Sequence, residues 1–92
     1  AWADGYPSYI MMKRKMPLKR DFHEAGNRLI DVFGEPDDCR DGLWYSREGG
    51  WMHIRPSGTE PVVRYIAENS RRDYIEKDYG IFQKVMESLC VE

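Results

Sequence analysis

The chain has 92 residues, of which 41% are hydrophobic and 13% aromatic, and its 14 Lys and Arg nearly balance 16 Asp and Glu, for a net charge of −2. This length suits one domain, and the composition is that of a folded protein. A slightly negative chain is not expected to bind nucleic acid, because such binding depends mostly on neutralising phosphates. No apolar run approaches the ~20 residues of a membrane span, so we expect no membrane partner.

The N-terminus shows no basic region followed by an apolar stretch, so we expect no signal peptide. The two cysteines, Cys39 and Cys90, lie far apart in sequence. Two thiols in a chain without an export signal are more often free than paired. We therefore expect a cytoplasmic location.

The chain begins with a short segment that is predicted to be a linker remnant. Residues 1–8 contain Gly5 and Pro7, and a single domain is predicted over residues 9–92. The apolar run at residues 9–12 predicts a strand, since it is too short to make a good helix.

A helix is predicted to begin at Asp21. The Asp21 side chain can accept from free backbone N–H groups, and Glu24 stands three residues later as a capping-box partner. Gly34 and Pro36 predict the end of the helix, since glycine adopts the positive φ of a helix terminus and proline prevents continuation. The apolar residues at helical spacing form one stripe: Phe22, Ala25, Leu29 and Val32.

Two strands joined by a tight turn are predicted next, followed by a third strand. Residues 43–45 and 51–54 are rich in aromatic side chains and flank the turn at 48–50, where the Gly-Gly pair favours a hairpin. Residues 62–67 are β-branched and aromatic, as in a strand.

From Arg72 onward the apolar period becomes that of an amphipathic helix. The residues that carry this period are Ile75, Tyr79, Phe82, Met86 and Leu89. The predicted order is β-α-β-β-β-α. This order indicates an α+β fold with a mainly antiparallel four-stranded sheet and two helices on one face.

The segment between the last two predicted strands, Arg55-Pro56-Ser57-Gly58-Thr59-Glu60-Pro61, has the groups needed to hold one phosphate. Arg55 offers a planar fork of donors that matches two phosphate oxygens. Ser57 and Thr59 add hydroxyl donors. Gly58 is expected to adopt positive φ and to let a ligand approach the backbone, whose N–H groups can converge on an anion. On composition alone, an ordinary turn between strands stays an alternative.

The specific string resembles the last domain of the α-D-phosphohexomutases, a family that includes phosphoglucomutase, phosphomannomutase and phosphoglucosamine mutase. The residues that carry the resemblance are Asp41-Gly42-Leu43, the hairpin, the heptapeptide that begins at Arg55, and Arg64 in the following strand. Pro7-Ser8-Tyr9 adds a weaker match, and the resemblance covers nearly the whole chain.

The resemblance implies a four-domain enzyme with one cleft. A serine of the first domain becomes phosphorylated, the second domain holds Mg²⁺, the third contacts the sugar, and the fourth grips the substrate's phosphate. It also implies a fold similar to that of the TATA-binding protein. The family's phosphate contacts fall on four positions here, with two further candidates beside them: Arg55, Ser57, Gly58 and Thr59, then Glu60 and Arg64.

The rest of the family's catalytic set is not found in this chain. There is no Asp-Gly-Asp-Gly-Asp metal loop and no Thr-Ala-Ser-His nucleophile. Ser57 is therefore predicted to hold ligand rather than to attack it, and Mg²⁺ is expected in the full-length enzyme but not on this domain. The expected partners are a sugar phosphate and the other three domains, and the isolated domain is expected to be inactive.

The remaining polar residues are predicted to have simpler roles. His23 and His53 have no second ligand or base at a suitable spacing, which favours structural roles. Asp37 and Asp38 are expected to be solvated rather than metal-bound, and Asp41 is predicted to belong to the turn before its strand. The basic residues 13–15 are predicted to be a solvated strand end that also attracts anions. An alternative function, a stand-alone phosphate-binding module, stays open, and the length of the coding sequence would decide between the two.

Overall fold

The computed structural model describes residues 9–18 and 21–90, with the side chain of Cys90 excepted. The predicted linker at residues 1–8 lies outside the described residues. The elements follow the predicted order: β1 (Ile10–Pro17), α1 (Phe22–Phe33), β2 (Leu43–Arg47), β3 (Gly50–Pro56), β4 (Val62–Asn69) and α2 (Arg72–Cys90).

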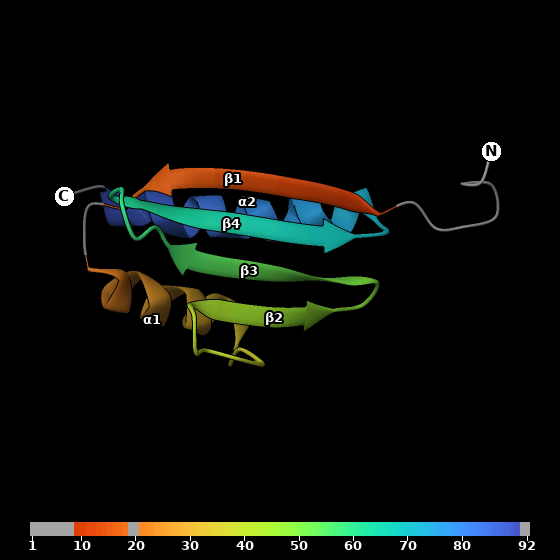
Figure 1. Cartoon of the computed structure of the whole chain (residues 1–92), viewed down its shortest axis with the longest axis horizontal. Coiled ribbons are helices and arrows are strands. Elements are labelled where there is room, and N and C mark those ends of the chain that lie inside the picture. The colour runs from red at the N-terminus through yellow and green to blue at the C-terminus, as the bar shows by residue number, and fades with distance from the viewer. Residues whose placement is uncertain (1–8, 19–20, 91–92) are drawn as a thin grey trace.

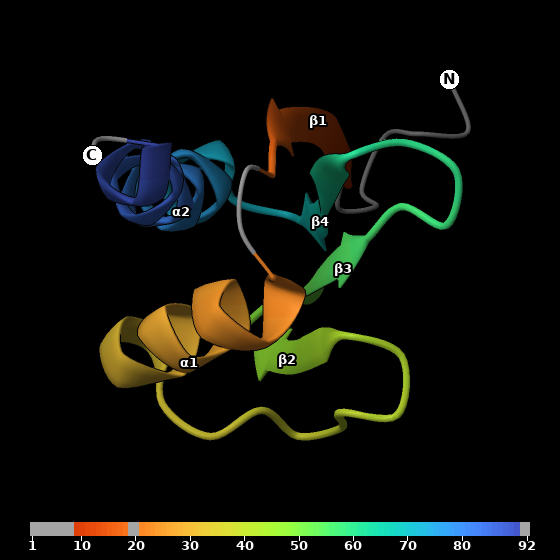
Figure 2. The same ribbon diagram turned by 90° about the vertical axis from the view of Figure 1, so that its left-hand side faces the viewer.

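The four strands form one antiparallel sheet in the order β1-β4-β3-β2 (Figure 1). Both helices lie on the same face of this sheet and leave its other face uncovered (Figure 2). The structure therefore confirms the predicted α+β class and the two-layer arrangement. Neither helix is long and apolar enough to cross a membrane, as far as the described residues go.

The core lies between the sheet and the helices. Alternate residues of β4, including Val63 and Tyr65, are fully buried beneath the helices, as is Ile54 of β3. Helix α2 covers β1 and β4 with the predicted stripe, of which Phe82 is fully buried and stacks at 5.2 Å between ring centroids on Tyr65. This packing confirms the predicted amphipathic helix.

Helix α1 differs from its prediction at one position. Asp21 caps the helix as expected by accepting from the N–H of His23, and Ala25 and Leu29 are fully buried. Val32, however, is 51% exposed, and the aromatic ring of Phe33 packs on Tyr45 instead. Phe33, and not Val32, therefore makes the apolar contact of the last helical turn.

Strand β1 is longer than predicted and includes the basic run. It continues from Ile10 to Pro17, and its register places Lys15 opposite Arg64 of β4. Residues 13–15 are exposed, as predicted, but they lie within the strand and not at its end. The run was misjudged because the strand is at the sheet edge, where charged side chains and a terminal proline are tolerated and the apolar signal is weak.

The hairpin between β2 and β3 fixes the register of the sheet. Its turn has two residues, Glu48 and Gly49, and Gly49 has φ of 82°. Gly50 is the first residue of β3 rather than part of the turn. A Cβ at Gly50 would lie 1.8 Å from the carbonyl oxygen of Glu68 in β4, so only glycine allows this approach. The buried Asn69 donates to the carbonyl of Glu48 at 3.0 Å, which joins the turn to the end of β4.

Gly50→Ala is expected to lower the free energy of unfolding by about 1–3 kcal/mol, because the added methyl forces β3 away from β4. Gly58→Ala is the matched control. Nothing lies within 4 Å of a Cβ at Gly58, so its effect is expected to stay within about 0.5 kcal/mol. Urea unfolding followed by circular dichroism measures both. Equal stabilities for the two variants would mean that the close approach at Gly50 does not constrain the sheet.

Candidate functional site

The candidate phosphate loop, residues 57–61, connects β3 to β4 (Figure 1). Arg55 and Pro56 belong to β3, so the arginine is held in the sheet and not in the loop. The loop is closed by a hydrogen bond from the N–H of Ser57 to the carbonyl of Val62 at 3.0 Å. The N–H of Leu18, just after β1, donates to the carbonyl of Pro61 at 2.7 Å. Hydrogen bonds therefore attach the loop to the start of β4 and to the residue that follows β1.

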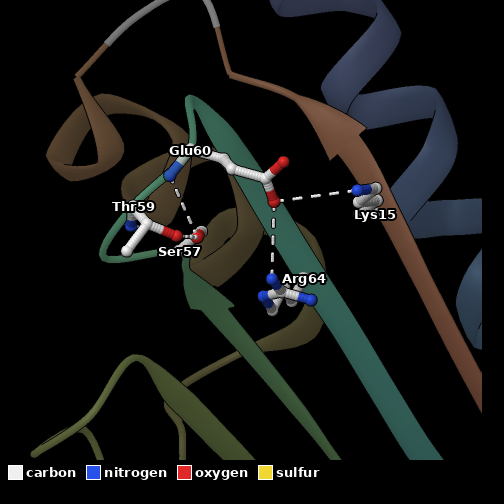
Figure 3. A network of polar contacts seen from close by, with 5 residues as sticks. All are labelled: Lys15, Ser57, Thr59, Glu60 and Arg64. Atoms are coloured by element: carbon white, nitrogen blue, oxygen red, sulfur yellow. Dashed lines mark hydrogen bonds and ion pairs between the residues drawn. The ribbon is translucent and has the colours of Figure 1, made fainter.

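Two backbone N–H groups converge on one oxygen atom inside the loop. The Oγ of Ser57 accepts from the N–H of Thr59 and from the N–H of Glu60, each at 3.2 Å (Figure 3). The Oγ1 of Thr59 lies 3.4 Å from the same oxygen. Converging N–H groups of this kind form an anion-binding concavity. In this structure the serine oxygen accepts the two bonds that a phosphate oxygen could accept.

Gly58 departs from its predicted conformation. The glycines with positive φ in the described chain are Gly34, Gly42 and Gly49, so the positive φ expected at Gly58 was wrong. The other expectation for Gly58 concerned room for a ligand. A Cβ added at this position would have no atom within 4 Å, so the loop backbone here faces open space.

Arg55 is half buried beside the loop. Its side chain is 40% exposed, and its Nε lies 3.9 Å from Oδ2 of Asp41. The Nε itself is buried and has no hydrogen-bond partner among the described residues. The exposed surface therefore belongs to the rest of the side chain, which includes the Nη groups that suit a phosphate.

Three cations lie side by side across the uncovered face of the sheet. The register pairs Arg55 of β3 with Arg64 of β4, and Arg64 with Lys15 of β1. Like charges in direct cross-strand pairs destabilise a sheet unless an anion lies nearby. We refer to Lys15, Arg64 and Arg55 as the basic row. The row ends at the candidate phosphate loop.

Glu60 supplies an anion to two members of the basic row. Its Oε1 lies 3.5 Å from Nη2 of Arg64 and 3.7 Å from Nζ of Lys15 (Figure 3). The backbone N–H of Glu60 points to Ser57, whereas its carboxylate is directed to the cations. Only the N–H suits a phosphate oxygen, since a carboxylate repels one. Next to this network, Lys13, Arg14 and Ile66 join Lys15 and Arg64 around a surface pocket of about 430 Å³.

The acidic and thiol side chains do not form a metal site in the part of the chain that is described. No group of three or more His, Cys, Asp or Glu side chains is placed to hold a metal ion there. Asp38 is partly exposed and bonds to Arg40, whose hydrogen bonds lower the pKa of that carboxyl to about 2. Cys39 is a free, exposed thiol.

The structure places the two histidines differently. His23 is exposed on α1, whereas the Nε2 of His53 contacts the backbone carbonyl of Asp41. Because a carbonyl can only accept, Nε2 is the donor.

Sequence reasoning assigned Asp41 only to a turn and Lys15 to a strand end. Neither the register that pairs Lys15 with Arg64 nor the loop contact that brings Asp41 to Arg55 was visible in the sequence, although Asp41-Gly42 belongs to the string that carried the resemblance.

Comparisons with known proteins agree on one family. The family model for the phosphoglucomutase/phosphomannomutase C-terminal domain matches residues 11–79. A phosphoglucosamine mutase of Methanocaldococcus jannaschii is 32% identical over 94% of this chain and 21% of its own length. A phosphoglucosamine mutase of Methanococcus maripaludis is 35% identical over 80% of this chain and 18% of its own length. The chain thus spans about a fifth of these relatives.

Glu60→Gln is expected to tighten the binding of inorganic phosphate by about two- to fivefold, since it frees Lys15 and Arg64 from an exposed carboxylate. The control is Glu76→Gln in α2, because Glu76 forms an exposed pair with Arg72 at the same four-residue spacing. Isothermal titration at low salt compares the two variants. Equal affinities for both variants, or weaker binding by Glu60→Gln, would show that Glu60 does not compete with phosphate for these cations.

Proposed function

Since the chain belongs to the phosphoglucomutase/phosphomannomutase C-terminal domain family, we propose that it grips the phosphate of a hexose phosphate in a phosphohexomutase. Such an enzyme interconverts hexose 1-phosphate and 6-phosphate through a phosphoserine and a bisphosphorylated sugar. Arg55, Ser57, Gly58 and Thr59 hold the phosphate in this proposal, and Arg64 adds a nearby positive charge.

The observation that carries this proposal is the convergence of two backbone N–H groups inside the loop. The N–H groups of Thr59 and Glu60 both point at Oγ of Ser57. An anion site whose donors already point inward costs little ordering entropy to occupy. When phosphate enters, the Ser57 hydroxyl turns from acceptor to donor, and the two N–H groups become available to phosphate oxygens.

Arg55 provides the charge that the neutral N–H groups lack. Its guanidinium can donate two parallel hydrogen bonds to one phosphate, and β3 fixes its backbone two residues before Ser57. A bisphosphorylated sugar must turn around between the two half-reactions of a mutase. The same phosphate-binding residues then hold the 6-phosphate in one half-reaction and the 1-phosphate in the other.

The chemistry of phosphoryl transfer belongs to other parts of such an enzyme. Among the described residues, no group of three or more His, Cys, Asp or Glu side chains is placed to hold a metal ion, and the Ser57 hydroxyl contacts Thr59 and the N–H of Glu60. We propose that the phosphoserine, the Mg²⁺ and the residues that contact the sugar are in the three other domains, and that this chain alone has no mutase activity. Glucosamine phosphate is the first substrate to test, because relatives that match most of this chain are named phosphoglucosamine mutases.

Arg55→Ala in a mutase that contains this domain is expected to lower kcat/KM by about 10- to 100-fold. The loss follows from removing a charge-assisted bidentate contact that also orients the sugar. Arg55→Lys is expected to restore only part of the activity, because a point charge cannot reproduce the planar fork. More bisphosphorylated intermediate should also escape into solution during turnover.

The control is Arg28→Ala, which removes the same charge from α1, where Arg28 bonds to Ser88 in the helical layer. Steady-state kinetics with glucosamine phosphate and a thermal melt of each variant supply the comparison. A folded Arg55→Ala enzyme with wild-type kinetics would refute the assignment of this loop.

A further inference from the structure

Asp41 lies against the base of Arg55 because of the glycine that follows it. Gly42 has φ of 85°, and a Cβ there would lie 2.4 Å from the carbonyl oxygen of Ile54 and 2.8 Å from Cβ of Arg55. The backbone at Gly42 therefore touches β3 at Arg55 and the residue before it. No other residue type allows the loop before β2 to come this close.

Two further contacts fix Asp41 in this place. The side chain of His53, on the same face of β3 as Arg55, donates to the Asp41 carbonyl. Leu43, two residues after Asp41, pairs with Ile54 in the sheet. These contacts fix the backbone of Asp41 against β3, and its carboxylate, 70% exposed, lies beside Arg55.

The contact between Asp41 and Arg55 involves one edge of the guanidinium. Oδ2 of Asp41 is 3.9 Å from Nε of Arg55, and that Nε is buried with no hydrogen-bond partner in the described chain. A buried guanidinium N–H without an acceptor is costly, so a short movement of the carboxylate toward Nε is favourable. A carboxylate at the Nε edge leaves the edge with two Nη groups free for a second anion.

We infer that Asp41 is a positioning residue for phosphate binding, which holds the Nε edge of Arg55 so that its Nη edge faces the Ser57–Thr59 loop. This inference rests on the proposed function. Asp41 does not touch the phosphate. It restricts a long, rotatable side chain to one orientation before the ligand arrives, which reduces the entropy lost on binding.

The charge of Asp41 makes the inference easy to test. A carboxylate near an anion site repels the anion, so its removal should tighten phosphate binding if charge alone matters. If Asp41 orients Arg55, its removal should weaken binding despite the loss of that repulsion. The two explanations therefore predict opposite changes in phosphate affinity for the same substitution.

The experiment measures inorganic phosphate affinity of the 92-residue chain by titration at constant ionic strength. Asp41→Asn is expected to weaken binding by about three- to tenfold. The control is Asp38→Asn, which removes the same charge from the same loop but leaves Arg55 untouched, since Asp38 pairs with Arg40. The control should bind phosphate as tightly as the wild type or more tightly.

A double-mutant cycle distinguishes positioning from any general damage to the fold. In an Arg55→Ala background, Asp41→Asn should no longer weaken binding, because no arginine is left to orient. Unchanged or tighter binding by Asp41→Asn in the wild-type background would overturn the inference, as would an equal loss in both backgrounds. If Arg55→Ala itself bound phosphate like the wild type, the proposed function would fail instead.

Discussion

The pairing of β3 with β4 is the constraint on which the rest of the molecule depends. One register buries Ile54, Val63 and Tyr65 beneath the helices and places Arg55 opposite Arg64 on the uncovered face. A shift of one residue would exchange the two faces, so the apolar core and the basic row cannot be changed independently. The close approach at Gly50 holds this register at the end of the sheet farthest from the phosphate loop. Core packing and the candidate site are thus two consequences of the same strand pairing.

Two carboxylates partly offset the three cations of the candidate site. Asp41 lies beside Arg55, and Glu60 lies between Arg64 and Lys15. The serine hydroxyl likewise accepts the N–H groups that would meet a phosphate. These internal partners reduce the repulsion within the basic row, which would otherwise destabilise the sheet. In the proposed function, Glu60 and the Ser57 hydroxyl compete with phosphate for these donors, whereas Asp41 orients Arg55.

Strong periodic signals in the sequence predicted most of the fold. The stripe of α2, the Asp21 cap and the Gly-rich hairpin each depend on local chemistry, so they could be predicted without knowledge of the tertiary structure. The edge strand β1 was predicted too short because its charged half has no apolar alternation. Val32 was wrongly predicted to face the core, because only the packing of Phe33 on Tyr45 decides which residue of the last turn does so. The loop residues of the site were identified from their chemistry and from a family resemblance. Their partners Asp41 and Lys15 come from other strands or loops, and no local pattern indicates them.

The most direct measurement of the central claim is a phosphate titration of the ¹⁵N-labelled chain, followed by the backbone amide signals. A few charge-assisted hydrogen bonds, offset by the cost of association, give an expected affinity near ~1 mM. The account predicts that the amides of Ser57, Gly58 and Thr59 shift first and most, and that they saturate together with the side-chain Nε–H of Arg55. Shifts centred elsewhere on the sheet, with these three amides unchanged at saturating phosphate, would contradict it.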